Sequence, residues 1–386
     1  MPCGYQNEEP LKNVSQLLKL NHDEISKSLR YKFRTVAGSV IESPFQKKDC
    51  ITARDALAKE LFNRLFNWLV RRLNFTVMPD EFLVDGADIN SLMNKYYHIG
   101  LLDIFGFEIF KLNSIEQLCI NYTNEKLQQL YINYVFKAEE KEFITQGLQD
   151  YLTELNFKDN QPVINLLDLA PTGIFFLIDE SCSVNTTDEA LCKKILKTHE
   201  KNDKIGAPKM ARMEFIVHHT ASSVEYNTDG FRFKNQDELG DFIEKALFNS
   251  ANPIIPRIYK GLCGNEKEST EGPKAKGKND KFLGAKFRMQ IKELMTELES
   301  CDCHFIRCLK PNDKKQKKLF MPVMTLQQIK YMGILDTIKV RKESYPIRRT
   351  YQKFYEKYDE LSSVHSKKSY LQHVKAGSNF KTMVQE

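Results

Sequence analysis

The 386-residue sequence has no long uninterrupted run of apolar residues. Its longest promising stretch, PVINLLDLAPTGIFFLIDE, is broken by Asp168 and Pro171 and does not predict a transmembrane segment. The N-terminus, MPCGYQNEEPLK, has neither the basic start nor the apolar segment of a signal peptide. We therefore expect a soluble protein that is not secreted.

Cysteines are few, and they lack the spacing of a disulfide framework. Nine in a long chain is an odd number, which predicts reduced thiols of the kind found in the cytoplasm. In CDCHFIRC the spacing of Cys301, Cys303 and His304 does not match a paired-ligand metal site. His218 and His219 are adjacent and cannot converge from one strand, so we interpret all of these residues as structural.

The composition is rich enough in apolar residues for a substantial core. Hydrophobic residues make up 41% of the chain, with 25 Phe and 16 Tyr. The length predicts two or more domains or one large irregular domain. The net charge of +6 is too small to name a partner, but its excess is local. Most of it lies in Lys274, Lys276, Lys278, Lys281, Lys286 and Arg288, with Asp280 as the only acid between Gly272 and Arg288.

Helical periodicity is strongest in two places. The segment TARDALAKELFNRLFNWLVRRLN predicts a helix with Thr52 as its N-cap. Ser114 and Gln117 form a capping-box signature at the start of a second helix, which continues without Pro or Gly to Gln146. At 1.5 Å per residue that helix is about 45 Å long. Further helices are expected in NVSQLLKLNHDEISKSL, INLLDLAPTGIFFLIDESC, ALCKKILKTHEKN, DELGDFIEKALFN, FRMQIKELMTELESC and TLQQIKYMGILDTIKVRKE.

Strands are expected in three segments. Residues 101–105 predict a short buried strand that ends at Gly106. MEFIVHHTASSVEYNTDGFRFKN predicts strands or hairpins, and HFIRCLK predicts a short strand that ends at Pro311. The segments RYKFRTVAGSVIESPFQKKD and 261–281 predict irregular structure and a flexible loop, respectively.

The corner DIFGFE is the strongest candidate site. An acid at the end of an apolar strand, such as Asp103, commonly faces a ligand or metal. Gly106 allows close approach of a phosphate to the backbone, although a buried salt bridge explains acids such as Glu108 equally well. The apparent phosphate loop GPKAKGKN has Asn279 in place of Ser or Thr and no preceding strand, which favours a plain cationic loop.

Several blocks, in order, resemble the myosin motor family. They are ARDALAKELFNRLFNWLV, DIFGFE, NSIEQLCINYTNEKLQQLYINYVFKAEEKEF, GIFFLIDESC, VEYNTDGFRFKN, HFIRCLKPN and QIKYMGILDTIKVRKESYPIRRTYQKFYEKY. The resemblance covers residues 10 to 380. Two segments, TVAGSVIE and HHTASSVEYNTDGF, differ from muscle-type sequences and are similar to the short myosins of apicomplexan parasites.

The family's phosphate loop (GESGAGKT) and switch I (NxNSSRFG) have no match in this sequence. The resemblance therefore implies the C-terminal half of a motor, with a mixed α/β, predominantly helical fold related to P-loop NTPases. The implied parts are the end of the upper 50-kDa subdomain with a connecting helix (1–100), switch II, the relay helix and the lower 50-kDa actin-binding subdomain (101–260), a basic linker like loop 2 (261–281), a strand of the central sheet with thiol-bearing helices (282–343), and an incomplete converter (344–386).

The resemblance also implies roles for single residues near ATP and Mg²⁺ in the complete motor. Asp103 would act through water near Mg²⁺, the Gly106 N–H would bind the γ-phosphate, and Glu108 would pair with a switch I arginine that has no counterpart here. Ser114 starts the relay helix. Phe136 within that helix and Gly333 in YMGILDTIKV would carry motion toward the converter.

Contact with the actin filament is implied at three places. These are the helix-loop-helix with Ile174, Phe175 and Phe176, the tract with Lys274, Lys276, Lys278 and Lys281, and the loop that contains Ser39. Phosphorylation of Ser39 would add negative charge to that basic loop. The parent protein would also bind a light chain or a calmodulin-like protein beyond this sequence.

We therefore expect part of a cytoplasmic motor of the actin cytoskeleton whose parent is an actin-activated ATPase. This chain alone is expected not to hydrolyse ATP. One alternative is a non-catalytic actin-binding or regulatory protein derived from a myosin. Another, a basic nucleic-acid-binding protein, is disfavoured because residues 261–281 contain no aromatic residue between their lysines.

Overall fold

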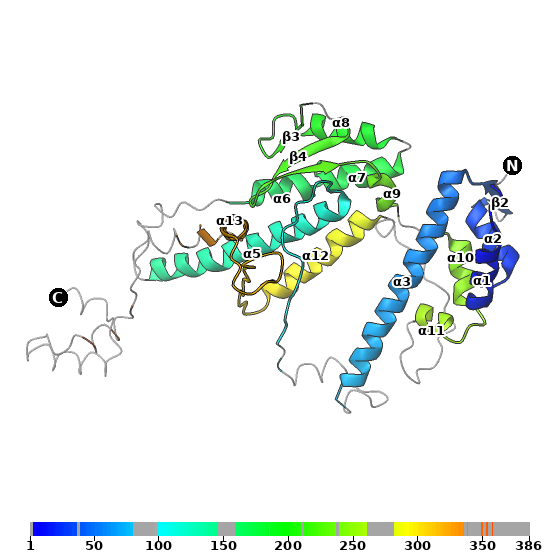
Figure 1. Ribbon diagram of the computed structural model, residues 1–386, viewed down its shortest axis with the longest axis horizontal. Helices are drawn as coiled ribbons and strands as arrows, with labels where there is room; N and C mark the ends of the chain where they lie inside the picture. The colour runs from blue at the N-terminus through cyan, green and yellow to red at the C-terminus, as the bar shows by residue number, and fades with distance from the viewer. Residues whose placement is uncertain are drawn as a thin grey trace, which may run out of the picture. The chain divides into compact units, whose positions relative to one another are not determined.

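The computed structural model describes most of the chain in separate ranges. These are residues 3–36, 39–79, 97, 99–145, 159–184, 186–209, 212–236, 239–260 and 282–332, with 334, 335, 338, 349, 353 and 357. The described residues are mostly helical, as expected, and they also form two small antiparallel sheets (Figure 1). They divide into two compact units. The first unit comprises Met1–Ile104, Phe175–Leu191 and Asp229–Met289, and the second comprises Phe105–Ile174, Cys192–Thr228 and Gln290–Glu386.

The first unit begins with two short helices where the sequence predicted one. They are α1 (Glu9–Leu18) and α2 (His22–Arg30). The break is at Asn21, whose side chain accepts the N–H groups of Asp23 and Glu24 at 2.8 and 3.3 Å and so caps α2.

A β-hairpin follows, so the prediction of irregular structure for this segment was wrong. Strands β1 (Tyr31–Val36) and β2 (Ser39–Pro44) pair antiparallel, with Val36 opposite Ser39. The ring of Phe33 stacks on that of Phe242, with 4.4 Å between centroids. The alternation of apolar and basic residues in YKFR matches this one-sided packing.

Helix α3 (Lys47–Val77) starts earlier than its apolar pattern indicated. The carboxylate of Asp49 accepts the N–H of Gln46 at 3.1 Å, which places the N-cap at Gln46. Thr52 is not the cap, because it lies inside the helix and its hydroxyl donates to the carbonyl of Lys48 at 2.9 Å.

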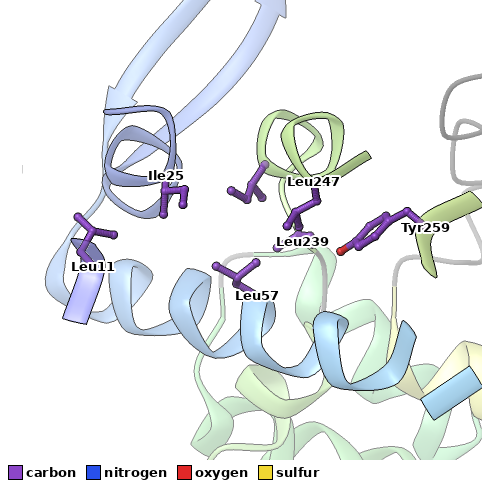
Figure 2. Close-up of a cluster of buried hydrophobic side chains, with 7 residues drawn as sticks. Leu11, Ile25, Leu57, Leu239, Leu247 and Tyr259 are labelled. Atoms are coloured by element: carbon purple, nitrogen blue, oxygen red, sulfur yellow. The ribbon is translucent and has the colours of Figure 1, made fainter. Parts of the chain in front are cut away.

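The apolar core of the first unit joins segments that are distant in sequence (Figure 2). Helices α10 (Asp241–Phe248) and α11 (Ile255–Lys260) supply part of it. The buried members are Leu11, Ile25, Leu57, Leu239, Ile243, Leu247 and Tyr259.

The same unit contains α7 (Ile174–Ser183), α9 (Phe231–Asn235) and the start of α12 (Leu283–Glu299). Arg232 closes the end of α7 by donating to the carbonyls of Ser181, Val184 and Thr186. The segment FRFKN is thus a helix rather than the strand that was predicted, and it follows Gly230, whose φ of 79° favours glycine.

The second unit is built around one long helix, α5 (Ile115–Thr145), as the sequence predicted. A three-stranded antiparallel sheet has the order β3-β4-β5. Its strands are β3 (Ile205–Gly206), β4 (Glu214–His218) and β5 (Ser223–Asn227), and the β4–β5 hairpin confirms the expected pairing.

Three further helices are α6 (Gln161–Asp168), α8 (Asp188–Thr198) and α13 (Pro322–Tyr331). The single helix predicted around INLLDLAPTGIFFLIDESC is therefore two helices, α6 and α7, with Pro171 between them. At Gly173 a Cβ would lie 2.7 Å from the backbone nitrogen of Leu169, so this turn requires glycine.

Two predicted strands are absent from the described residues. Residues 101–105 have no regular secondary structure and no paired strand, and Leu101 and Phe105 are 93% and 73% exposed. Residues 304–310 form no strand either, and the side chains of Phe305 and Arg307 pack on α5. The ring of Phe305 meets that of Tyr131 edge-on at 5.0 Å, and the guanidinium of Arg307 lies 4.4 Å from the same ring. Within the described ranges, we find no helix with the length and apolar character needed to cross a bilayer.

Candidate functional site

The site is centred on residues 105–113, which we call the corner segment. It has no regular secondary structure and leads directly into α5. Three asparagine side chains, from Asn113, Asn121 and Asn124, bind its backbone groups in place of a paired strand. Side-chain amides can do this because each carries both donors and an acceptor.

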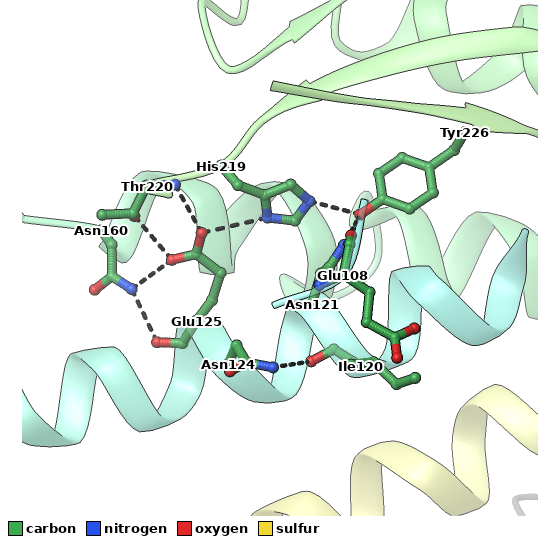
Figure 3. Close-up of polar contacts among 9 residues, drawn as sticks. All are labelled: Glu108, Ile120, Asn121, Asn124, Glu125, Asn160, His219, Thr220 and Tyr226. Atoms are coloured by element: carbon green, nitrogen blue, oxygen red, sulfur yellow. Dashed lines mark hydrogen bonds and ion pairs between the residues drawn. The ribbon is translucent and has the colours of Figure 1, made fainter. Parts of the chain in front are cut away.

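Asn121 binds both backbone groups of Glu108 (Figure 3). Its Oδ1 accepts the Glu108 N–H at 2.8 Å, and its Nδ2 donates to the Glu108 carbonyl at 2.8 Å. The second amide hydrogen goes to the hydroxyl of Tyr226, also at 2.8 Å. Asn121 is fully buried, so these bonds are shielded from competing water.

The other two asparagines hold the ends of the corner segment. Asn124 donates to the carbonyl of Phe105 at 3.1 Å. Asn113 accepts the N–H of Phe110 at 2.8 Å and donates to the Glu225 carbonyl of β5 at 2.9 Å. The corner segment is therefore attached to both α5 and the sheet of the second unit.

The first turn of α5 touches the Glu108 side chain. The backbone N–H of Ser114 donates to Oε1 of Gln117 at 3.0 Å, which confirms half of the predicted capping box. Nε2 of Gln117 donates to a carboxylate oxygen of Glu108 at 3.4 Å. The helix start and the acid of the corner are thus linked through one side chain.

Glu125 lies about one turn beyond Asn121 on α5 and is only 2% exposed. Its carboxylate accepts the Thr220 N–H at 2.8 Å, the Thr220 hydroxyl at 2.9 Å and Nδ2 of Asn160 at 2.6 Å (Figure 3). Nδ1 of His219 lies 3.3 Å away. Burial raises the pKa of the Glu125 carboxyl, but its bond to and attraction for His219, with the other donors, hold that pKa below its ordinary value of 4.5.

His219 connects Glu125 to the tyrosine that binds Asn121. Its Nε2 lies 2.8 Å from the Tyr226 hydroxyl, and the ring of Phe107 in the corner segment meets the imidazole edge-on at 5.2 Å. Burial raises the pKa of Tyr226 far above its ordinary value, so the phenol stays neutral. The interpretation of His219 as structural agrees with these contacts.

The predicted ligand-facing residues are placed differently. Asp103 belongs to the first unit and is exposed, whereas Gly106 and Glu108 belong to the second. Gly106 is exposed, and a Cβ there would have no neighbour within 4 Å. Glu108 is half-buried against α5. The open surroundings of Gly106 leave room for a ligand in the second unit, and Glu108 connects the corner segment to α5.

The predicted actin-contact residues of α7 are mostly not at the surface. Ile174 and Phe175 are completely buried. The prediction that their side chains lie free at the surface to contact actin is therefore wrong. Phe176 lies beneath Arg288, whose guanidinium is 3.7 Å from the ring centroid. The apolar character of IFF reflects core packing, which gives the same periodicity as a docking face.

Several predicted residues lie outside the described structure. Ser39 is described and exposed at the start of β2. The backbone of Phe136 is part of α5, but its side chain is outside the described residues. The others outside it are Gly333, Lys274, Lys276, Lys278 and Lys281. Among described residues, including Cys301, Cys303 and His304, no group of three or more His, Cys, Asp or Glu side chains could hold a metal.

The comparisons with known proteins agree with the order of the sequence blocks. A family model described as "Myosin head (motor domain)" matches residues 3–386. The chain belongs to the myosin motor-domain family. Unconventional myosin-XV of Homo sapiens is 33% identical over 354 residues, which are 89% of this chain and 10% of that protein.

Two other myosins show the same level of similarity. The high molecular weight form of myosin-1 from Acanthamoeba castellanii is 34% identical over 359 residues, 92% of this chain and 21% of that protein. Unconventional myosin-Va of Homo sapiens is 33% identical over 374 residues, which are 92% of this chain and 19% of that protein. The chain therefore spans only about a tenth to a fifth of the length of these myosins.

Sequence reasoning missed the residues that hold the corner segment. The signal was present as a polar stripe on α5, with Gln117, Asn121 and Glu125 four residues apart and Asn124 three residues after Asn121. Polar residues that share a face with buried apolar residues indicate an internal hydrogen-bonded site. Their partners, His219 and Tyr226, are too distant in sequence to be predicted from spacing.

Proposed function

We propose that this chain is the part of an actin-based motor that senses the γ-phosphate of ATP and transmits its state along a helix. The observation that carries the proposal is the double hydrogen bond from Asn121 to Glu108. It joins the corner segment to α5 within the same unit. A displacement of the corner segment would therefore be transmitted directly to α5.

The residues of the corner fit contact with a nucleotide in the complete motor. Asp103 is exposed, and a single carboxylate suits Mg²⁺, which keeps several of its waters. The open surroundings of Gly106 permit a phosphate to approach its N–H. ATP and Mg²⁺ would supply the phosphoryl-transfer chemistry, in which positioned donors and charges stabilise the transition state.

Helix α5 gives the sensor its reach. Its 31 residues correspond to about 46 Å at 1.5 Å per residue. Asn121 and Asn124 bind the corner segment from the first turns, and Phe136 lies in the later part of the same helix. We assign Phe136 and Gly333 to the transmission of motion toward a converter.

We assign actin contact to the cationic tract and to the hairpin that contains Ser39. The lysines of residues 261–281 complement an acidic filament surface through local charge. Ser39 is exposed at the start of β2, in a hairpin whose first strand carries Lys32 and Arg34. A phosphate at Ser39 would add negative charge and weaken such a contact or recruit a new basic partner.

Cosedimentation of the full chain with actin filaments tests the proposal. We expect the chain to bind filaments equally well with and without ATP, because no phosphate loop or switch I motif occurs in these 386 residues. Replacing Lys274, Lys276, Lys278 and Lys281 with alanine should weaken binding. The matched control replaces Lys314, Lys315, Lys317 and Lys318 with alanine, which removes the same charge. This variant should still bind filaments.

The outcomes separate the parts of the proposal. Failure of the unmodified chain to bind would contradict the actin assignment. ATP-dependent release would show that this chain forms a nucleotide site by itself. Equal loss of binding in both lysine variants would mean that binding depends on the net charge of the chain and not on the lysines of residues 261–281.

A further inference from the structure

The Asn121 side chain uses every donor that its amide has. One Nδ2 hydrogen goes to the Glu108 carbonyl and the other to the Tyr226 hydroxyl, while Oδ1 accepts the Glu108 N–H. The oxygen of Tyr226 must therefore act as an acceptor toward Asn121. This condition fixes where the hydroxyl hydrogen of Tyr226 can point.

The hydroxyl hydrogen points at His219. Nε2 of His219 lies 2.8 Å from the Tyr226 oxygen, and it can accept that hydrogen only if it carries no proton. The imidazole proton is then on Nδ1, which donates to Oε1 of Glu125 at 3.3 Å (Figure 3). One direction of donation thus runs from Asn121 through Tyr226 and His219 to Glu125.

We propose that His219 is a positioning residue whose protonation loosens the grip of Asn121 on Glu108. A second proton on Nε2 makes that nitrogen a donor, so the Tyr226 hydroxyl hydrogen has to turn away. Among the described hydrogen bonds of that oxygen, its other partner is Nδ2 of Asn121, which is also a donor. The Tyr226 oxygen then accepts from two donors, and its own buried hydrogen has no acceptor among those partners; turning that hydrogen toward Asn121 weakens the hold of Nδ2 and frees the amide to reorient.

Charged and titratable groups around His219 are compatible with this switch. Glu125 from α5 faces Nδ1 and provides a countercharge, so a protonated imidazole would not be an unpaired buried charge. Tyr226 from β5 faces Nε2, and Cys119 from α5 acts electrostatically on that tyrosine. Asn160 and Thr220 donate hydrogen bonds to the Glu125 carboxylate, and neither of them titrates.

The inference deepens the proposed function, because it adds proton regulation to the same corner segment. It does not depend on nucleotide or actin. The chain of hydrogen bonds that links Glu108, Asn121, Tyr226, His219 and Glu125, which we call the latch, lies wholly within the second unit. Its test can therefore fail while actin binding succeeds, and the reverse also holds.

Hydrogen-deuterium exchange of the full chain, followed in peptides that cover residues 105–113, measures the grip on Glu108. After correction for intrinsic exchange, protection should fall as the solution is acidified while the chain stays folded, because acid favours the protonated imidazole. In His219→Gln, whose side chain does not titrate, this pH dependence should disappear. An identical pH profile in His219→Gln and the unmodified chain would overturn the proposal.

A pair of tyrosine variants separates the latch from general loss of a hydrogen bond. Tyr226→Phe should speed exchange in the corner segment about tenfold at neutral pH, because Asn121 loses its buried acceptor. Tyr122→Phe is the control: Tyr122 is equally buried on α5, but its hydroxyl donates to Asp168 at 2.5 Å instead. Equal effects of both variants on residues 105–113 would contradict a specific latch.

The unmodified protein offers a test that needs no stable variant. Nitrogen-15 NMR of the labelled histidines distinguishes the two neutral tautomers, and the latch requires His219 to carry its proton on Nδ1 at neutral pH. A proton on Nε2 at neutral pH would overturn the direction of donation on which the proposal depends.

Discussion

Asn121 holds Glu108 by both sides of its backbone, with 2.8 Å from its Oδ1 to the Glu108 nitrogen and 2.8 Å from its Nδ2 to the Glu108 oxygen. Asn121→Ala removes both bonds and leaves the Tyr226 hydroxyl without its buried donor. We expect the free energy of unfolding to fall by about 2 to 4 kcal/mol, measured by denaturant titration.

The control for this variant is Asn165→Ala. Asn165 is exposed on α6 in the same unit, and its Oδ1 accepts a bond from Gln161 at 2.7 Å. An exposed bond of this kind should change the free energy of unfolding by less than about 0.5 kcal/mol. Similar losses in both variants would mean that the Asn121 bonds contribute no more to the free energy of unfolding than an exposed hydrogen bond does.

Acid should destabilise the second unit through Glu125. The folded-state pKa of this carboxyl lies below its ordinary value of 4.5, so the ionised form contributes stability above that pH and loses it as the pH falls through the lower folded value. The stability deficit of Glu125→Gln should therefore shrink in strong acid, as the pH falls below 4.5 through the folded-state pKa. Glu299→Gln, at an exposed position, controls for net charge. A deficit that does not change with pH would contradict this assignment.

Local signals predicted the helices well and the sheets poorly. The capping signature at Ser114 and Gln117 located the start of α5, because a helix end is decided by neighbours a few residues away. Residues 101–105 have the apolar pattern of a strand, but a strand also needs a partner, and none of the described strands pairs with them. Burial was wrongly predicted there for the same reason.

The candidate site was predictable only in its exposed part. The acid and glycine of DIFGFE are recognisable because their chemistry lies within six residues. The bonds from Asn160, His219 and Tyr226 join segments that are 35 to 105 residues apart in sequence, and spacing cannot reveal them. Ile174 and Phe175 show the opposite limit, since apolar docking residues and core residues have the same pattern.

Arg288 should stabilise the first unit through Asp179. Its Nη2 lies 2.7 Å from the Asp179 carboxylate, which also accepts from Asn235 at 2.9 Å. Burial raises the pKa of Asp179 despite these partners, so the ionised form costs stability above that pKa. Arg288→Ala should cost about 3 kcal/mol near pH 7 in denaturant titrations, because the charge is left without its partner.

A double-mutant cycle tests the electrostatic origin of that loss. The deficit of Arg288→Ala should shrink as the pH falls through the raised pKa of Asp179, since protonation removes the unpaired charge. Adding Asp179→Asn to Arg288→Ala should restore part of the stability at neutral pH. If it restores none, the loss comes from the stacking of Arg288 on Phe176 instead.

Tyr259→Phe should stabilise the first unit. The Tyr259 hydroxyl is buried in the apolar core, and it has no hydrogen-bond partner among the described residues. A buried hydroxyl without a partner has lost its water bonds and gained none, so its removal should raise the free energy of unfolding by about 1 kcal/mol. Tyr5→Phe is the matched control, because the Tyr5 hydroxyl donates to the Ser26 carbonyl at 3.2 Å and its loss should be destabilising. Thermal unfolding of both variants measures the two signs, and a lower melting temperature for Tyr259→Phe would show that its hydroxyl is bonded in solution.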